Sequence, residues 1–82
     1  MRFTWDPRKA KANLRKHGVS FDEALTVFDD GNADVEFDIA HSDDEDRYVI
    51  RGYSDKARRL AVIRCYRQGG FVRIISARKI SY

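Results

Sequence analysis

Several common classes of protein are excluded by what this 82-residue sequence lacks. Its single cysteine, Cys65, can form neither an internal disulfide bond nor a pair of zinc-binding thiolates. No apolar run approaches the ~18 residues that cross a membrane, and residues 1–21 show neither the apolar segment nor the cleavage site of a secretion signal. We therefore expect one small domain in the reducing cytoplasm, without contact with a membrane.

Most motifs for cofactors, metals and nucleophilic catalysis are also missing. No glycine-rich phosphate loop or nucleophile elbow is present, and Gly69-Gly70 is typical of a hairpin turn. His17 and His41 lie far apart, and the acidic run of residues 43–46 lacks the alternating spacing and the glycine of a calcium loop. We expect no cofactor and no metal, and we interpret the acidic run as a solvated surface and Cys65 as buried filler of a strand.

The charged residues form three blocks along the chain. Residues 1–21 carry six basic residues and one acid (net +5), residues 22–46 carry eleven acids and no lysine or arginine (net −11), and residues 47–82 carry ten basic residues and one acid (net +9). Two basic segments brought together in space would form a surface suited to a phosphate backbone. In the alternative interpretation, both basic blocks neutralise the acidic block within the folded monomer.

The N-terminal third predicts two consecutive helices. Asp6-Pro7 combines a favourable N-cap with a favourable first helical residue, and Gly18 is the expected stop of a helix over residues 8–17. Ser20 and Glu23 match the capping box of a second helix, in which the Glu23 side chain would bond back to the first turn. The apolar face of that helix contains Phe21, Ala24, Leu25 and Phe28.

The rest of the chain predicts strands joined by short turns. Such consecutive strands pair antiparallel, and Phe3–Trp5 is a further short, strand-like start. We therefore expect an α+β fold in which two N-terminal helices pack on one face of an antiparallel β-sheet of about four strands. The four strands are expected at Ala33–Asp38, Arg47–Tyr53, Arg59–Arg67 and Phe71–Lys79.

Alternation along the final strand predicts where its arginines lie. Val72 and Ile74 have the spacing of core residues, and Arg78 continues their row as the strand leaves the core. Arg78 is therefore expected at the rim of the sheet, close to helix ends and loops. The alternative is a salt bridge between Arg78 and a buried acid such as Asp6 or Glu23.

Metal-free RNA cleavage would suit the polar residues that remain. In this reaction a ribose 2′-hydroxyl attacks the adjacent phosphate, so the enzyme must help remove a proton, stabilise added negative charge and help the 5′-oxygen to leave. A histidine or a carboxylate can transfer the proton, and arginine or lysine can stabilise the charge. The sequence supplies such groups in Lys16, His17, Glu45, Arg47 and Arg78.

Four segments together form a longer pattern: FTWDPRKAKANLRKHGVSFDEALTVF (residues 3–28), HSDDEDR (residues 41–47), GYS (residues 52–54) and RIISAR (residues 73–78). In this order they resemble the BrnT toxins of bacterial type II toxin–antitoxin systems, over nearly the whole chain. The resemblance implies a RelE-like ribonuclease that inhibits translation. It also implies a partner antitoxin, BrnA, with a ribbon-helix-helix domain through which the pair would mainly contact operator DNA.

The resemblance also suggests which side chains matter. Arg78 and Lys16 are our candidates for phosphate charge, and His17 or Glu45 for proton transfer. In the alternatives, His17 only caps its helix, Glu45 is one more solvated acid, and Asn13 bonds to backbone where helix and sheet meet. A glycine is expected in the turn where Ala57 stands. The polar residues that match by position are Lys9, Asn13, Lys16, His17, His41, Ser42, Glu45, Arg47, Arg67, Arg73 and Arg78, of which Lys9, Arg47, Arg67 and Arg73 are expected to bind RNA.

Two functions from different classes fit these observations. The first is an endoribonuclease toxin held inactive by its antitoxin. The second is a non-catalytic, toxin-like module that binds nucleic acid or protein within a repressor complex. Because both would bind RNA with salt-dependent affinity, only cleavage separates them.

Overall fold

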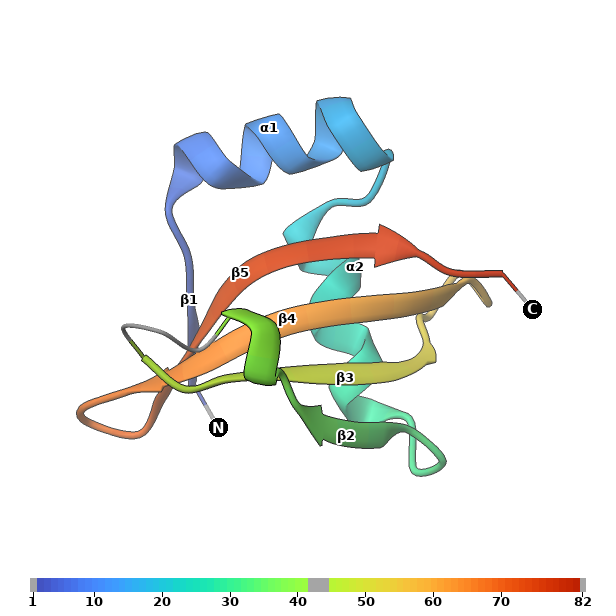
Figure 1. The fold of residues 1–82 in the computed structure, drawn as a ribbon. Helices are drawn as coiled ribbons and strands as arrows, with labels where there is room; N and C mark the ends of the chain where they lie inside the picture. Colours follow the sequence, from blue (N-terminus) through green and yellow to red (C-terminus); the bar gives the residue numbers. More distant parts are fainter. Residues whose placement is uncertain (1, 42–44, 82) are drawn as a thin grey trace.

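The computed structural model describes residues 2–41 and 45–81 (Figure 1). Two short 3₁₀ turns, η1 and η2, accompany two α-helices and five strands. In chain order the elements are β1 (Arg2–Thr4), α1 (Pro7–His17), α2 (Phe21–Thr26), η1 (Val27–Asp29), β2 (Asp34–Phe37), η2 (Ile39–His41), β3 (Arg47–Tyr53), β4 (Arg59–Arg67) and β5 (Phe71–Lys79).

The strands form one mixed sheet in the order β1-β5-β4-β3-β2. The four strands from β2 to β5 pair antiparallel with their neighbours, which confirms the predicted α+β class and the antiparallel meander. The N-terminal segment adds a fifth strand, because β1 pairs parallel with the start of β5. Local sequence could not predict this pairing, since it joins the two ends of the chain.

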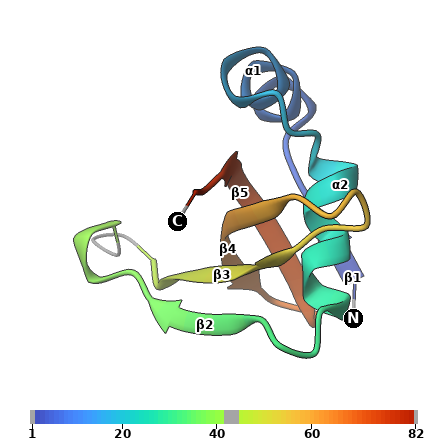
Figure 2. The ribbon, with the colours of Figure 1, turned by 90° about the vertical axis from the view of Figure 1, so that its right-hand side faces the viewer.

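The two helices occupy different positions relative to the sheet (Figures 1 and 2). Helix α2 lies across one face, which we call the helix face, whereas α1 runs along the edge of the sheet beside β5. We call the opposite side of the sheet the open face. The core lies between α2 and the helix face, and its buried members are Val19, Phe21, Ala24, Val27, Ile50, Leu60, Val62, Val72, Ile74 and Ala77.

The predicted helix caps are confirmed. The Asp6 carboxylate accepts a hydrogen bond from the Arg8 backbone at 2.9 Å, and the Ser20 hydroxyl accepts one from the Glu23 backbone at 3.0 Å. Gly18 ends α1 in the left-handed conformation, with φ at 70°. These caps fix where each helix starts or stops, and so they orient both helices against the sheet.

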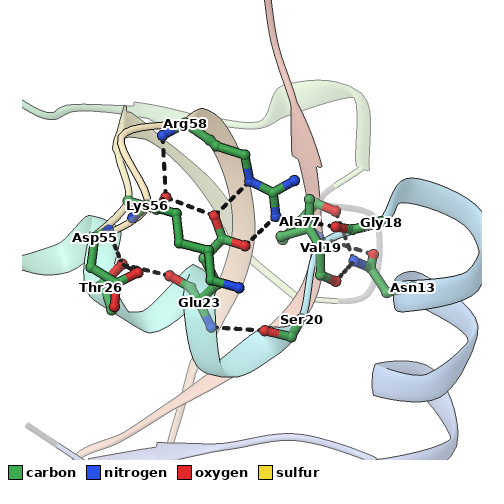
Figure 3. A network of polar contacts seen from close by, with 11 residues as sticks. Asn13, Gly18, Val19, Ser20, Glu23, Thr26, Asp55, Lys56, Arg58 and Ala77 are labelled. Carbon is green, nitrogen blue, oxygen red and sulfur yellow. Dashed lines mark hydrogen bonds and ion pairs between the residues drawn. The ribbon is translucent and has the colours of Figure 1, made fainter.

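The expected role of the Glu23 side chain is wrong. Instead of turning back to its own helix, the buried carboxylate accepts hydrogen bonds from the Ser54 hydroxyl at 2.7 Å and from Arg58 Nε at 2.9 Å (Figure 3). Arg58 also donates to the Gly18 carbonyl at 3.1 Å. Chiefly through the hydrogen bond from Arg58, the pKa of Glu23 is lowered. The ion pair therefore ties the start of α2 to the turn between β3 and β4.

Asn13 joins α1 to the sheet through backbone hydrogen bonds, as anticipated. Its Nδ2 donates to the Ala77 carbonyl at 2.8 Å and to the Val19 carbonyl at 3.0 Å, and its Oδ1 accepts from the Ala77 amide at 3.1 Å (Figure 3). Beyond the three residues of β5 that pair with β1, the Asn13 side chain thus takes the place of a neighbouring strand. The contact holds α1 beside the part of β5 that leads to Arg78.

An irregularity in β5 overturns the predicted direction of Arg78. Ile63 pairs with Ser76 and Arg64 pairs with Ile74, so Ile75 is an extra residue that shifts the alternation. Ala77 is consequently fully buried on the helix face, and Arg78 is exposed on the open face instead of continuing the core row.

Candidate nucleic-acid interface

Arginine side chains lie at both ends of the open face. Residues opposite one another in register share a face, so Arg47 and Arg73 lie on either side of Cys65, and Arg51 and Arg78 on either side of Ala61. Arg47 and Arg73 form one row across the strands, and Arg51 and Arg78 form a second. Because Arg47 and Arg51 are four residues apart on β3, the two rows are ~13 Å apart. A band of positive charge therefore runs along the open face.

A hollow of about 510 Å³ lies between these rows. Its apolar floor contains Val49, Ile63 and Ile75, one from each of the three central strands. Arg47, Arg51, Ser76 and Arg78 supply polar groups around it, and residues 36–40 of β2 and η2 form its remaining wall. Apolar surface beside guanidinium groups can accept the sugar or base of a nucleotide together with its phosphate.

The arginines differ in how far acids neutralise them. Arg51 forms ion pairs with Asp34 at 3.6 Å and Glu36 at 3.8 Å. Within residues 2–41 and 45–81, by contrast, no acid forms an ion pair with Arg73 or Arg78. The alternative in which Arg78 pairs with Asp6 or Glu23 is therefore wrong. Asp6 interacts electrostatically with Arg73 without forming an ion pair, so neither guanidinium group is held in a salt bridge within these residues.

Glu45 lies within an arginine cluster at the hairpin end of the face. Its carboxylate accepts hydrogen bonds from Arg67, and it lies 3.9 Å from Arg47 Nη2. The hydrogen bond from Arg67 is the main cause of the lowered pKa of Glu45. Cys65 is buried beside them, as predicted, and burial raises the pKa of its thiol. The structure thus brings together Glu45, Arg47 and Arg67, three of the residues singled out by sequence.

Helical geometry separates the polar residues of α1. With about 100° per residue, Lys9 and Lys16 fall on one side of Asn13, and Ala10 and His17 fall on the other. Ala10 packs against the core, so its side of α1 is turned toward the helix face. Lys9 and Lys16, both exposed, therefore border the open face, whereas the half-buried His17 does not.

Two of the matching residues cannot be placed. The backbone of His41 ends η2, but its side chain and all of Ser42 lie outside the described residues. Among the arginines that line the hollow, sequence reasoning missed Arg51. The alternation of Arg47, Val49 and Arg51 along β3 could have indicated it, because residues two apart on a strand share a face.

The described residues offer no evident metal site or membrane span. Across residues 2–41 and 45–81, no three side chains of His, Cys, Asp or Glu come close enough to hold a metal ion. Among the helices in that part of the chain, none is long and apolar enough to cross a membrane.

Comparison with known proteins identifies the family. Residues 5–82 match the family model described as "Ribonuclease toxin, BrnT, of type II toxin-antitoxin system". The chain belongs to the BrnT toxin family. No curated protein matches the sequence at a significant level.

The fold of a solved BrnT agrees with this assignment. A crystal structure of the Brucella abortus ribonuclease toxin BrnT is similar to the present structure with a TM-score of 0.78 and 25% sequence identity. The match covers 100% of this chain and 99% of that chain. The resemblance seen in the sequence is thus confirmed, and with it the α+β fold and the membership in a family of type II toxin–antitoxin systems.

Proposed function

We propose that this BrnT-family protein is a metal-independent endoribonuclease that cleaves RNA on the open face and thereby inhibits translation. The observation that carries the proposal is the pair Arg73 and Arg78, whose guanidinium groups lie on that face without an acidic partner among the described residues. A cation that forms no ion pair within the described part of its chain is suited to bind phosphate.

The proposed chemistry depends on stabilising charge. When a ribose 2′-oxygen attacks the adjacent phosphate, its proton passes to solvent water, the bond from phosphorus to the 5′-oxygen breaks, and the 5′-oxygen leaves with a proton from water; between these events negative charge builds up on the phosphate oxygens. Arg78, at the edge of the hollow, is placed to hold these oxygens, while Arg73 and Arg47 bind a neighbouring phosphate at the other row. Since the hollow has an apolar floor, water is partly excluded and each charge–charge interaction is stronger. Lys9 and Lys16 extend the positive surface along α1.

The two candidates for proton transfer differ in their surroundings. Glu45 lies at the face, but the hydrogen bonds from Arg67 lower its pKa and make it a weak base. We assign Glu45 to hold Arg67 and Arg47 in position, as a positioning residue. His17 lies on the side of α1 turned toward the helix face, and its role in the proposal is to end the helix beside Gly18.

The proposal includes a partner. A BrnA-like antitoxin with a ribbon-helix-helix domain would neutralise the toxin in the cytoplasm, and the pair would contact operator DNA mainly through that antitoxin. Family membership supports an antitoxin partner, since the family is one of type II toxin–antitoxin systems.

RNA cleavage by the purified protein in excess EDTA tests the proposal. We expect cleavage that leaves a 2′,3′-cyclic phosphate and that falls at least tenfold in Arg78→Ala, which corresponds to about 1.4 kcal/mol of transition-state stabilisation. Arg15→Ala on the exposed surface of α1 is the matched control. Absence of cleavage by a well-folded wild-type protein would instead favour a non-catalytic binding module in the repressor complex.

A further inference from the structure

The helix face carries a band of aromatic residues that α2 covers only in part. We call Phe3, Phe28, Phe37, Tyr48 and Tyr66 the aromatic belt. Their rings follow one another from β1 to β2: Phe3 and Phe28 lie 4.9 Å apart, Tyr66 and Tyr48 5.5 Å, and Tyr48 and Phe37 5.5 Å between centroids. Tyr66 is 55% and Phe37 42% exposed, so this end of the belt presents aromatic surface to solvent. Surfaces of this kind mark sites of protein association.

A buried cation, Arg64, lies inside the belt. Its guanidinium carbon is 5.2 Å from the centroid of Phe28 and 5.8 Å from those of Tyr48 and Tyr66, and the residue is only 4% exposed. The hydrogen bond from its Nη2 to the Tyr66 hydroxyl, at 3.2 Å, is the sole hydrogen bond of the side chain within the described part of the chain. Nε and Nη1 are buried without a hydrogen-bond partner.

This arrangement is incomplete as a monomer. A buried guanidinium ordinarily has a carboxylate partner, and cation–π contacts compensate for only part of its lost hydration. No acid within residues 2–41 and 45–81 forms an ion pair with Arg64. The half-exposed Tyr66 marks the approach to the guanidinium, because its hydroxyl occupies the position that an incoming acceptor would take.

We propose that the aromatic belt docks a segment of the antitoxin that places an aspartate or glutamate against Arg64 between apolar side chains. The carboxylate replaces the Tyr66 hydroxyl as acceptor, and the apolar side chains cover Tyr66, Tyr48 and Phe37. Tyrosine and arginine are the residue types that most often dominate the affinity of a protein interface.

The surrounding charge favours a protein over RNA as the occupant. Phe28 and Phe37 belong to the acidic block of residues 22–46. Asp29 lines a hollow of about 340 Å³ together with Phe3 and Phe28. These acids repel a phosphate backbone, whereas a single carboxylate directed at Arg64 is attracted by the unpaired guanidinium. Arg64, Tyr48 and Tyr66 also lie on the opposite side of the sheet from Arg73 and Arg78, so this part of the belt is separate from the proposed cleavage site, whereas Phe37 borders both.

Binding of a purified BrnA-like antitoxin, the partner in the proposed function on which this inference rests, tests the docking site. Because Arg64→Met replaces an unpaired buried charge by an apolar side chain of similar length, we expect its unfolding midpoint to be unchanged or raised. We also expect Arg64→Met and Tyr66→Ser each to weaken antitoxin binding at least tenfold in calorimetry. The matched controls Arg15→Met and Leu14→Ala, at exposed positions of α1, should stay within twofold of wild type.

RNA cleavage by the free variants separates this inference from the proposed function. We expect Arg64→Met and Tyr66→Ser to cleave RNA like the wild type while they bind the antitoxin weakly. Unchanged antitoxin affinity in both folded variants would overturn the docking site, whatever the result for cleavage. Weaker RNA binding with unchanged antitoxin affinity would also overturn it, and would assign the belt to the nucleic acid.

Discussion

The two faces of the sheet treat arginine in opposite ways. On the helix face, Arg64 is buried under aromatic rings and depends on cation–π contacts. On the open face, Arg78 is exposed at the edge of a hollow, and Arg73 is half-buried one row away. Arg67 on the same face is, by contrast, neutralised by its ion pair with Glu45. This difference supports the two proposals, in which the open face binds RNA and the helix face is covered by the antitoxin.

The largest expected effect is the loss of stability in Glu23→Gln, which tests the buried side of the helix face. The carboxyl side chain of Glu23 is 2% exposed and ion-paired with Arg58, whose side chain is 31% exposed, so Glu23→Gln removes the charge partner of a partly buried guanidinium. Because the charge-assisted hydrogen bonds from Arg58 are weakened, we expect a loss of about 2 kcal/mol in the free energy of unfolding. Urea unfolding at neutral pH measures it, with Asp22→Asn at the neighbouring exposed position as control. An equal loss in the control would show that the ion pair does not matter.

The pH dependence of the same pair has a defined sign. Arg58 lowers the pKa of Glu23 in the folded state, so the stabilisation is present above the ordinary pKa of 4.5 and is lost as the pH falls through the lower, folded-state pKa. Unfolding curves of wild type and Glu23→Gln should therefore converge in acid. A difference that stays constant from neutral pH into acid would contradict this assignment.

The next effect concerns RNA affinity on the open face. Arg73→Ala removes one proposed phosphate contact, so the slope of log affinity against log salt should decrease by about 0.7 for single-stranded RNA. Fluorescence anisotropy with a 2′-O-methyl RNA, which cannot be cleaved by attack of its own 2′-hydroxyl, measures the slope. Arg15→Ala should leave the slope unchanged. The assignment of Arg73 fails if the two variants behave alike.

The substitution Ala57→Gly is expected to have a smaller effect, on stability alone, and to leave both faces of the sheet unaltered. Ala57 adopts φ of 59°, the left-handed conformation that favours glycine, in the turn that carries Arg58. Ala57→Gly should therefore raise the free energy of unfolding by about 1 kcal/mol, without altering RNA cleavage. Thermal unfolding checks the first expectation. Destabilisation would mean that the alanine side chain makes a favourable contact.

The smallest expected effect is that of His17→Ala on the rate of RNA cleavage. Because His17 shares the side of α1 with Ala10, His17→Ala should change the rate of RNA cleavage by less than threefold. The measurement is the cleavage rate from pH 5 to 8, compared with that of Lys16→Ala. A loss of tenfold or more, together with a lost pH dependence, would make His17 the proton-transfer group after all.

Local features of the fold were predictable from sequence. The caps at Asp6 and Ser20 and the stop at Gly18 depend on residues within one turn of each helix, and all three are confirmed. The glycine that the family resemblance implies in the turn of Ala57 agrees with the structure, since Ala57 adopts a positive φ. The backbone bonds of Asn13 were also anticipated, because a buried amide beside a sheet edge must satisfy its donors and acceptors.

Features that depend on distant contacts were not predictable. The extra residue Ile75 reverses the face of Arg78, and nothing in strict alternation signals it. Glu23 fits a local capping box, yet Arg58, which is distant in sequence, competes successfully for its carboxylate. Regular alternation along β3 and β4 indicates which of their arginines share the open face, whereas the position of Arg78 on that face is visible only in the structure. Whether these arginines bind RNA stays a prediction.

The most direct test of the account compares matched arginines on the two faces in the free toxin. Arg78→Met and Arg64→Met remove the same charge from opposite sides of one sheet, and RNA cleavage in EDTA is measured for both folded variants. We predict a loss of at least tenfold for Arg78→Met and a rate within twofold of wild type for Arg64→Met. Equal losses, or a loss confined to Arg64→Met, would contradict the assignment of the open face to RNA.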